Sequence, residues 1–130
     1  MVKFYEFYVI HISGVPLFHQ KANASIESVN KNMVSGFISA IQSVVSAQND
    51  EEKIEIIKFK NTKLIILQQN LYQLFFIARV SQKEKEKPAR KELIKLSDIF
   101  IEDYRKNLIE WEGEINVFQN FRYRLSNYWI

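Results

Sequence analysis

The spacing of apolar residues changes along the chain, and its first section has the pattern of strands. Residues 4–12 are almost all β-branched or aromatic, which is typical of a β-strand. Ser13 and Gly14 then supply a turn, because glycine tolerates positive φ, and a second strand is expected from Val15 to about Lys21. Pro16 cannot donate a backbone hydrogen bond, so we expect this second strand at an edge of its sheet.

A helical period replaces this pattern after a polar linker. Asn30 is suited to cap the start of a helix, and Asn49 and Asp50 are suited to stop it. The apolar positions that recur at helical spacing are Val34, Phe37, Ile38, Ile41, Val44 and Val45. Serines occupy much of the opposite side of the helical wheel. We therefore expect an amphipathic helix over residues 30–49.

Three apolar segments follow at residues 53–59, 63–69 and 71–80, and the connections between them are short. Parallel crossovers need a dozen or more residues, so these segments are expected to form an antiparallel meander. A sheet with one solvated face alternates apolar and polar residues, whereas the last two segments contain runs of successive apolar residues. The sheet is therefore expected to be covered on both faces.

Two further helices are predicted near the end of the chain. The charged run at residues 83–92 leads into the first of them, and Pro88 is suited to its first turn. The apolar stripe of this helix is Leu93, Leu96, Phe100, Tyr104 and Leu108, and that of the last helix is Phe118, Phe121, Leu125 and Tyr128. The element order is ββ-α-βββ-α-α, which predicts a single α/β domain, an α+β sandwich, over residues 1–130.

Composition and charge agree with one globular domain. The 130 residues are 47% hydrophobic and 25% charged, and the net charge of +3 is small for a dedicated nucleic-acid or membrane-surface binder. Cysteine is absent from the sequence, which excludes disulfides and thiolate chemistry. No apolar run reaches the roughly 18 residues of a membrane helix, and the N-terminus does not have the pattern of a signal peptide. We expect a cytoplasmic protein that reaches a membrane only through a partner.

The only two histidines, His11 and His19, lie on either side of the first turn. A tight Ser-Gly loop would place the two imidazoles on different faces of the sheet, His19 opposite Tyr8 and the other opposite Pro16. A three-residue loop would instead set them opposite each other, and the sequence leaves both registers open. Even in the second register a metal ion would need a third ligand, and only Glu6 is near. We expect a hairpin with neither a metal ion nor a catalytic role.

Other catalytic and cofactor signatures are missing from the sequence. The three glycines, at positions 14, 36 and 113, are too far apart to form a phosphate-binding loop. Carboxylates gather at Asp98, Glu102 and Asp103, but basic residues are interspersed among them, which is typical of a solvated helix face. We therefore expect a protein that is not an enzyme and that uses no cofactor.

The segment FRYRLSNYW, residues 121–129, indicates a second class of function, because arginines and aromatic residues alternate in it. Such interleaving occurs on platforms that bind single-stranded nucleic acids. The other interpretation is an amphipathic helix that buries Phe121 and Leu125 and leaves Arg122 and Arg124 outside. The small net charge favours the amphipathic helix. Nucleic-acid binding by a small basic-aromatic domain is therefore the alternative function.

The element order, opened by YVIHISGVPLFH at residues 8–19, resembles the longin domain, a profilin-like fold, over essentially the whole chain. NMVSGFISAIQSVVS at residues 32–46 looks like stand-alone archaeal longin-type proteins, and WEGEINVFQNF at residues 111–121 is a third point of similarity. The related roadblock fold usually begins with a helix, which is not predicted here. The resemblance implies a five-stranded antiparallel sheet in the order 2-1-5-4-3, with the first helix on one face and the second and third helices on the other.

Longin domains bind proteins, so the resemblance implies a non-catalytic protein-interaction module of the trafficking-adaptor type. Its partner would be a small GTPase, another longin or roadblock domain, or a second copy of the chain. No coiled-coil SNARE segment follows residue 130, so a SNARE role is not expected. The surfaces that the family uses map onto Met33, Phe37, Ile41 and Val44 of the first helix and onto Ile54, Ile56 and Lys58 of the third strand.

The third strand is expected to be the second open edge of the sheet. It follows the first helix and pairs onward only with the next strand. Lysines protect its ends, as they do at many natural edges, while Ile54, Ile56 and Ile57 leave its middle apolar. An edge of this kind suits the regulated addition of a strand from a partner.

Overall fold

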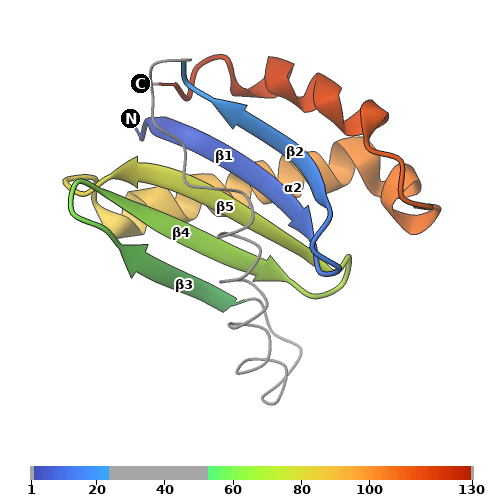
Figure 1. Ribbon diagram of the computed structural model, residues 1–130, viewed down its shortest axis with the longest axis horizontal. Coiled ribbons are helices and arrows are strands. Elements are labelled where there is room, and N and C mark those ends of the chain that lie inside the picture. Colours follow the sequence, from blue (N-terminus) through green and yellow to red (C-terminus); the bar gives the residue numbers. More distant parts are fainter. Residues whose placement is uncertain (1, 24–52, 130) are drawn as a thin grey trace.

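A five-stranded antiparallel sheet forms the framework of the molecule (Figure 1). The computed structural model describes residues 2–23 and 53–129. The strands are β1 (Phe4–His11), β2 (Pro16–Lys21), β3 (Lys53–Lys58), β4 (Thr62–Gln69) and β5 (Leu74–Ser81). They lie in the order β2-β1-β5-β4-β3, so the predicted α+β fold and strand order are confirmed.

The turns between strands follow from the local sequence, with one difference from the prediction. Gly14 has a φ of 94°, in the left-handed region that glycine favours, and its N–H donates to the His11 carbonyl at 2.8 Å. The fifth strand was expected from residue 71, but it begins at Leu74. The reason is that Gln73 has a φ of 58°, which closes a turn and interrupts the extended backbone.

Two helical segments cover one face of the sheet (Figure 1). They are α2 (Glu86–Ile109), which crosses behind the strands, and η1 (Asn116–Leu125), which packs beside β2. Aromatic rings fill the space between these layers. The ring of Phe100 on α2 lies 5.6 Å from that of Phe76 on β5 and 5.0 Å from that of Phe121 on η1. The expected packing of the two later helices on one face is therefore confirmed.

The last helix differs from the prediction in type and in length. Residues 116–125 form a 3-10 helix, and Trp129 makes a parallel bridge with Phe4 of β1. Three residues per turn suits Phe118 and Phe121, which are three apart and both buried. Tyr128 was expected on the helix, but its carbonyl accepts a hydrogen bond from the Phe4 N–H at 2.6 Å. Residues 128–129 are thus tied to the start of β1, an inner strand of the sheet.

The opposite face of the sheet is also apolar and buried, as the sequence predicted. Its buried side chains are Tyr8, Ile10, Leu64, Ile66, Phe75 and Ile77. They alternate along β4 and β5 with the residues that face α2. The helix predicted over residues 30–49, with the apolar positions assigned to it, lies outside the described residues.

Candidate functional site

β3 is an edge of the sheet, and its register shows which of its backbone groups point outward. Among the described strands it pairs with β4 alone. The Phe59 N–H donates to the Thr62 carbonyl at 2.8 Å, so these two residues form a hydrogen-bonded pair. Such pairs alternate along an antiparallel ladder, so the N–H and C=O groups of Ile57 and Glu55 point toward β4. The residues whose backbone groups point outward are Ile54, Ile56 and Lys58.

The side chains of β3 lie above and below the sheet and do not cover this outward array. Ile54 and Ile56 are partly buried against the core beneath α2, whereas Ile57 packs against the opposite face. Lys58 lies toward α2, where its Nζ is 3.8 Å from the Glu86 carboxylate. The middle of the edge is therefore apolar, as the sequence predicted, and β4 is its neighbour among the described strands. The other predicted partner-binding residues, Met33, Phe37, Ile41 and Val44, lie outside the described residues.

β2 is the other edge, as Pro16 predicted, but η1 covers part of it. The Gln119 side chain donates from Nε2 to the Leu17 carbonyl at 2.8 Å. Leu17 is the extra residue of a β-bulge in the pairing of β2 with β1, and Pro16 before it has no N–H to offer. An incoming strand would therefore find fewer open backbone groups on β2 than on β3.

The register of the first hairpin separates the two histidines. His19 pairs with Tyr8, as in the first of the two registers considered, but the bulge removes Pro16 from the position opposite His11. The His19 ring stacks on Tyr8 at 4.4 Å, and the His11 ring lies 4.5 Å from Trp111 on the other face. Within residues 2–23 and 53–129, no three His, Cys, Asp or Glu side chains gather in a way that could hold a metal ion.

His19 belongs to a buried charge cluster that the sequence reasoning missed. The Glu6 carboxylate is fully buried and accepts hydrogen bonds from His19 Nε2 at 2.8 Å and from the Tyr8 hydroxyl at 2.7 Å. Arg79 of β5 donates from Nε to the other carboxylate oxygen at 2.8 Å. We call these four residues the Glu6 cluster. It joins β1, β2 and β5 on the face opposite α2.

The surroundings of Glu6 keep its carboxylate charged. Burial raises the pKa of Glu6, but the hydrogen bonds from His19 and Tyr8 and the charge of Arg79 outweigh it, so the pKa lies below its ordinary value of 4.5. Burial beside this carboxylate raises the pKa of Tyr8, which keeps the phenol protonated. A general base needs a pKa near the working pH and access to a substrate. Glu6 has neither, so the cluster stabilises the fold and is poorly suited to catalysis.

A bulge in β1 explains why the sequence did not indicate this cluster. Phe4 pairs with Val80 and Glu6 pairs with Arg79, so Tyr5 is an extra residue in β1. Strict alternation would place Phe4 and Glu6 on the same face, whereas the bulge turns Glu6 away from α2. One signal was available: Glu6 and Arg79 are isolated charges of opposite sign within apolar strands, and buried charges are usually paired.

The arginine–aromatic segment forms an amphipathic helix with the faces that the sequence predicted. Phe121 and Leu125 are buried, whereas Arg122 and Arg124 are exposed. The Arg124 guanidinium makes two hydrogen bonds to the Asp103 carboxylate, at 2.9 and 2.8 Å. This pairing reduces the positive charge that the segment could offer to a phosphate backbone. The carboxylates predicted on the solvated face of α2 are all exposed: Asp98, Glu102 and Asp103.

Comparison with known proteins indicates the fold without indicating a family. No protein-family model matches the chain, and no curated protein matches it. Among the solved structures that resemble it is a chain from a structure of the mammalian SRP receptor, with 17% sequence identity and a TM-score of 0.54. The similarity covers 96% of this chain and 93% of that chain. None of the described helices is long and apolar enough to cross a membrane. An identity this low shows the fold alone, and it supports the longin-like arrangement that the sequence implies.

Proposed function

We propose that the protein is a non-catalytic interaction module that binds a protein partner by adding a strand to β3. The observation that carries this proposal is the outward array of backbone groups on Ile54, Ile56 and Lys58. Hydrogen bonds from an added strand to such an array supply affinity, and the neighbouring side chains supply specificity. Such binding needs no cofactor and no catalytic residue.

Three further points support the proposal. The similar chain comes from a receptor structure, so a fold of this kind occurs in a protein that works through a partner. The resemblance to longin domains, including the stand-alone archaeal type, favours a small GTPase or another longin or roadblock domain as that partner. The Glu6 cluster contains residue types that occur in catalytic sites, but its carboxylate is buried and charged. The protein would act in the cytoplasm, or at a membrane through its partner.

A second copy of the chain is the simplest partner to test. Two β3 strands that pair around a two-fold axis would join the two sheets into one continuous sheet. The partly buried Ile54 and Ile56 would lose their remaining exposed surface in such a dimer. A standard specific interface buries about 1,200 to 2,000 Å² in total. Pairing with a different longin or roadblock chain would use the same backbone groups.

A pair of proline substitutions tests the proposal through the register of β3. Ile56→Pro removes an N–H that points outward, so the β3–β4 ladder and the circular dichroism spectrum should be preserved. We expect this variant to associate at least about tenfold more weakly in light scattering or against an isolated partner, the size of loss expected at a binding hot spot. Ile56→Lys should have a similar effect, because an edge lysine opposes strand pairing.

Ile57→Pro is the matched control, because it removes an N–H that points toward β4. It should weaken the attachment of β3 itself and lower stability by about 1–3 kcal/mol, the cost of an unpaired backbone group. The proposal fails if the wild type stays monomeric at high concentration and recovers no partner that protects β3. It also fails if Ile56→Pro associates as tightly as the wild type.

A further inference from the structure

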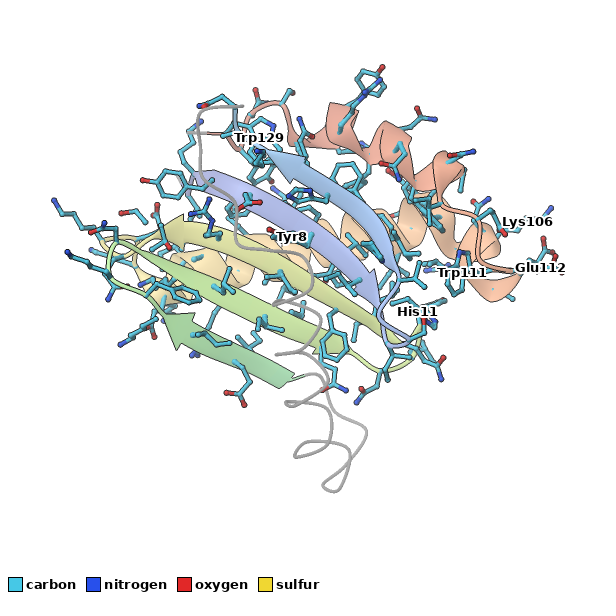
Figure 2. The ribbon with its side chains drawn as sticks, viewed as in Figure 1. Tyr8, His11, Lys106, Trp111, Glu112 and Trp129 are labelled. Atoms are coloured by element: carbon cyan, nitrogen blue, oxygen red, sulfur yellow. The ribbon has the colours of Figure 1, made fainter. Side chains whose placement is uncertain are left out.

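A second surface lies at the end of the sheet where the β1–β2 and β4–β5 turns meet the end of α2. An open cavity of about 600 Å³ is lined there by residues of β1, of the β4–β5 turn and of the chain around the end of α2. Cavities that hold ligands typically measure roughly 300–1,000 Å³. Figure 2 shows His11 and Trp111 beside each other at this end, in agreement with the 4.5 Å between their rings.

The wall of this cavity carries the most exposed large apolar side chains that the structure describes. Leu71 of the β4–β5 turn is 79% exposed, and Ile109 at the end of α2 is 70% exposed. Exposed apolar residues that gather on one surface commonly mark a binding site. Tyr123 is 68% exposed as well, but it lies on η1 and does not line the cavity. Leu71 and Ile109 are thus suited to receive an apolar group.

Hydrogen bonds fix the walls of the cavity. The Gln73 carbonyl accepts from the Ile12 N–H at 2.8 Å, which ties the β4–β5 turn to the end of β1. The φ of 58° at Gln73 is costly for a residue other than glycine, and such conformations occur often at binding sites. The Trp111 indole donates from Nε1 to the Glu114 carbonyl at 2.7 Å. A preformed site of this kind loses little conformational entropy on binding.

The rim of the cavity is acidic on the side of Trp111. Residues 109–114 include three exposed carboxylates, Glu110, Glu112 and Glu114, which outnumber Lys106, the exposed basic residue in the last turn of α2. Figure 2 shows Lys106 at the same end of the molecule as Trp111 and Glu112. The carbonyl end of α2 adds partial negative charge at the same place. The β1–β2 and β4–β5 turns contribute no charged residue. Burial lowers the pKa of His11, so this imidazole is neutral near pH 7 and does not offset the carboxylates.

We infer that this cavity docks a basic segment of a partner protein, which inserts one large apolar side chain against Leu71 and Ile109. Lysine or arginine residues on either side of that anchor face Glu110 and Glu112. Opposite charges steer such a segment to the rim, while the apolar anchor supplies most of the affinity. An acidic segment would be repelled by the same rim. This surface is distinct from the outward backbone array of β3 and goes beyond strand addition.

Selection from a random peptide display library tests this inference without a known partner. The library is selected on the full chain and counter-selected on the Leu71→Ser/Ile109→Ser double variant. We expect the enriched peptides to combine one large apolar residue with flanking lysine or arginine. Synthetic copies should bind the double variant at least about tenfold more weakly, as truncation of a hot spot predicts. Their affinity should also fall as salt is raised, because the rim charges are exposed.

Two matched controls and one spectroscopic signal make the result specific. Tyr123→Ser removes an equally exposed ring outside the cavity, and Ile56→Pro removes the strand-addition site, so neither should weaken peptide binding. The chain has two tryptophans, and the peptide should shift the indole N–H signal of Trp111 while that of Trp129 stays in place. The inference is overturned if no peptide is enriched, if the enriched peptides are acidic, or if they bind the double variant as well as the wild type.

Discussion

The two edge strands of the sheet have the same length, six residues each, but they are held in opposite ways. β2 is fixed from several sides: the Glu6 cluster holds one face through His19, the core holds Leu17 and Phe18 on the other, and Gln119 covers an outer carbonyl. β3 is held by its ladder with β4 and by partly buried isoleucines. Its Lys58 also lies 3.8 Å from the Glu86 carboxylate, and both side chains are exposed. Within the described residues, β2 is thus held on more sides than β3.

Under the proposed function, this difference would keep one edge for a partner. Backbone groups at an edge must bond to protein or to water, and those of β2 are partly satisfied by the chain itself. The outward groups of β3 make no backbone hydrogen bond to other residues of the described ranges, and the proposed function assigns them to an added strand. Lys58 is a charge of the kind that protects natural edges, but it lies toward Glu86 on α2 instead.

The largest effect should come from breaking the cluster that holds β2. Glu6→Ala leaves the Arg79 charge buried without its carboxylate, which should lower the free energy of unfolding by about 3–5 kcal/mol. Glu55→Ala removes an exposed carboxylate from β3 and should change stability by less than about 0.5 kcal/mol. Urea unfolding of both variants measures the contrast. Equal losses from the two substitutions would show that β2 is no more firmly held than β3.

The same cluster should make the attachment of β2 sensitive to acid. Because the folded pKa of Glu6 lies below 4.5, its contribution to stability is complete above that pH and is lost as the pH falls through the folded pKa. The stability difference between the wild type and Glu6→Gln should therefore be greatest near neutral pH and should shrink below pH 4.5. A difference that stays constant or widens in acid would contradict the charge assigned to Glu6.

The two histidines should differ in their importance for stability. His19→Ala removes a hydrogen bond to a buried carboxylate and should cost about 1.5–3 kcal/mol. His11→Ala removes a ring contact with Trp111 near the surface and should cost less, about 0.5–1.5 kcal/mol. Thermal and urea unfolding compare the two, and association should survive in both variants. A reversed order would mean that the Glu6 cluster does not hold β2.

The smallest effect concerns the Gln119 side chain, which covers a backbone carbonyl at the outer side of β2. Gln119→Ala leaves the Leu17 carbonyl without its side-chain donor and should cost about 1 kcal/mol. Asn120→Ala, at an exposed neighbouring position, should be close to neutral. Urea unfolding compares the two variants. If both change stability equally, the hydrogen bond does not protect this edge.

Much of the fold could be predicted because it depends on local patterns. Runs of β-branched and aromatic residues predicted the strands, short connections predicted the meander, and Pro16 predicted an edge. Helical spacing likewise predicted the apolar stripe of α2, which is buried except for a partly buried Leu108. The type of the last helix was missed, because residues spaced by three and four suit both an α-helix and a 3-10 helix over so short a segment.

The candidate sites depend on features that the alternation of apolar and polar residues along a strand cannot show. The bulges at Tyr5 and Leu17 each shift the faces of a strand by one residue, and the Glu6 cluster exists only because of such a shift. The cavity beside Trp111 needs a strand end, a turn and a helix end that are far apart in the sequence. The edge position of β3 was predictable because it follows from strand order, and its apolar middle follows from the isoleucines of one short segment.

Hydrogen exchange of the β3 amides, measured by NMR, distinguishes strand addition at β3 from an edge that does not pair with a partner. In a dilute sample the outward amides of Ile54, Ile56 and Lys58 should exchange quickly, while that of Ile57 is protected by β4. With a second copy at high concentration, or with a bound partner, the outward amides should exchange at least about tenfold more slowly, because an added strand accepts their hydrogen bonds. Outward amides that are already protected in the dilute monomer, or that stay unprotected in the associated state, would contradict strand addition at β3.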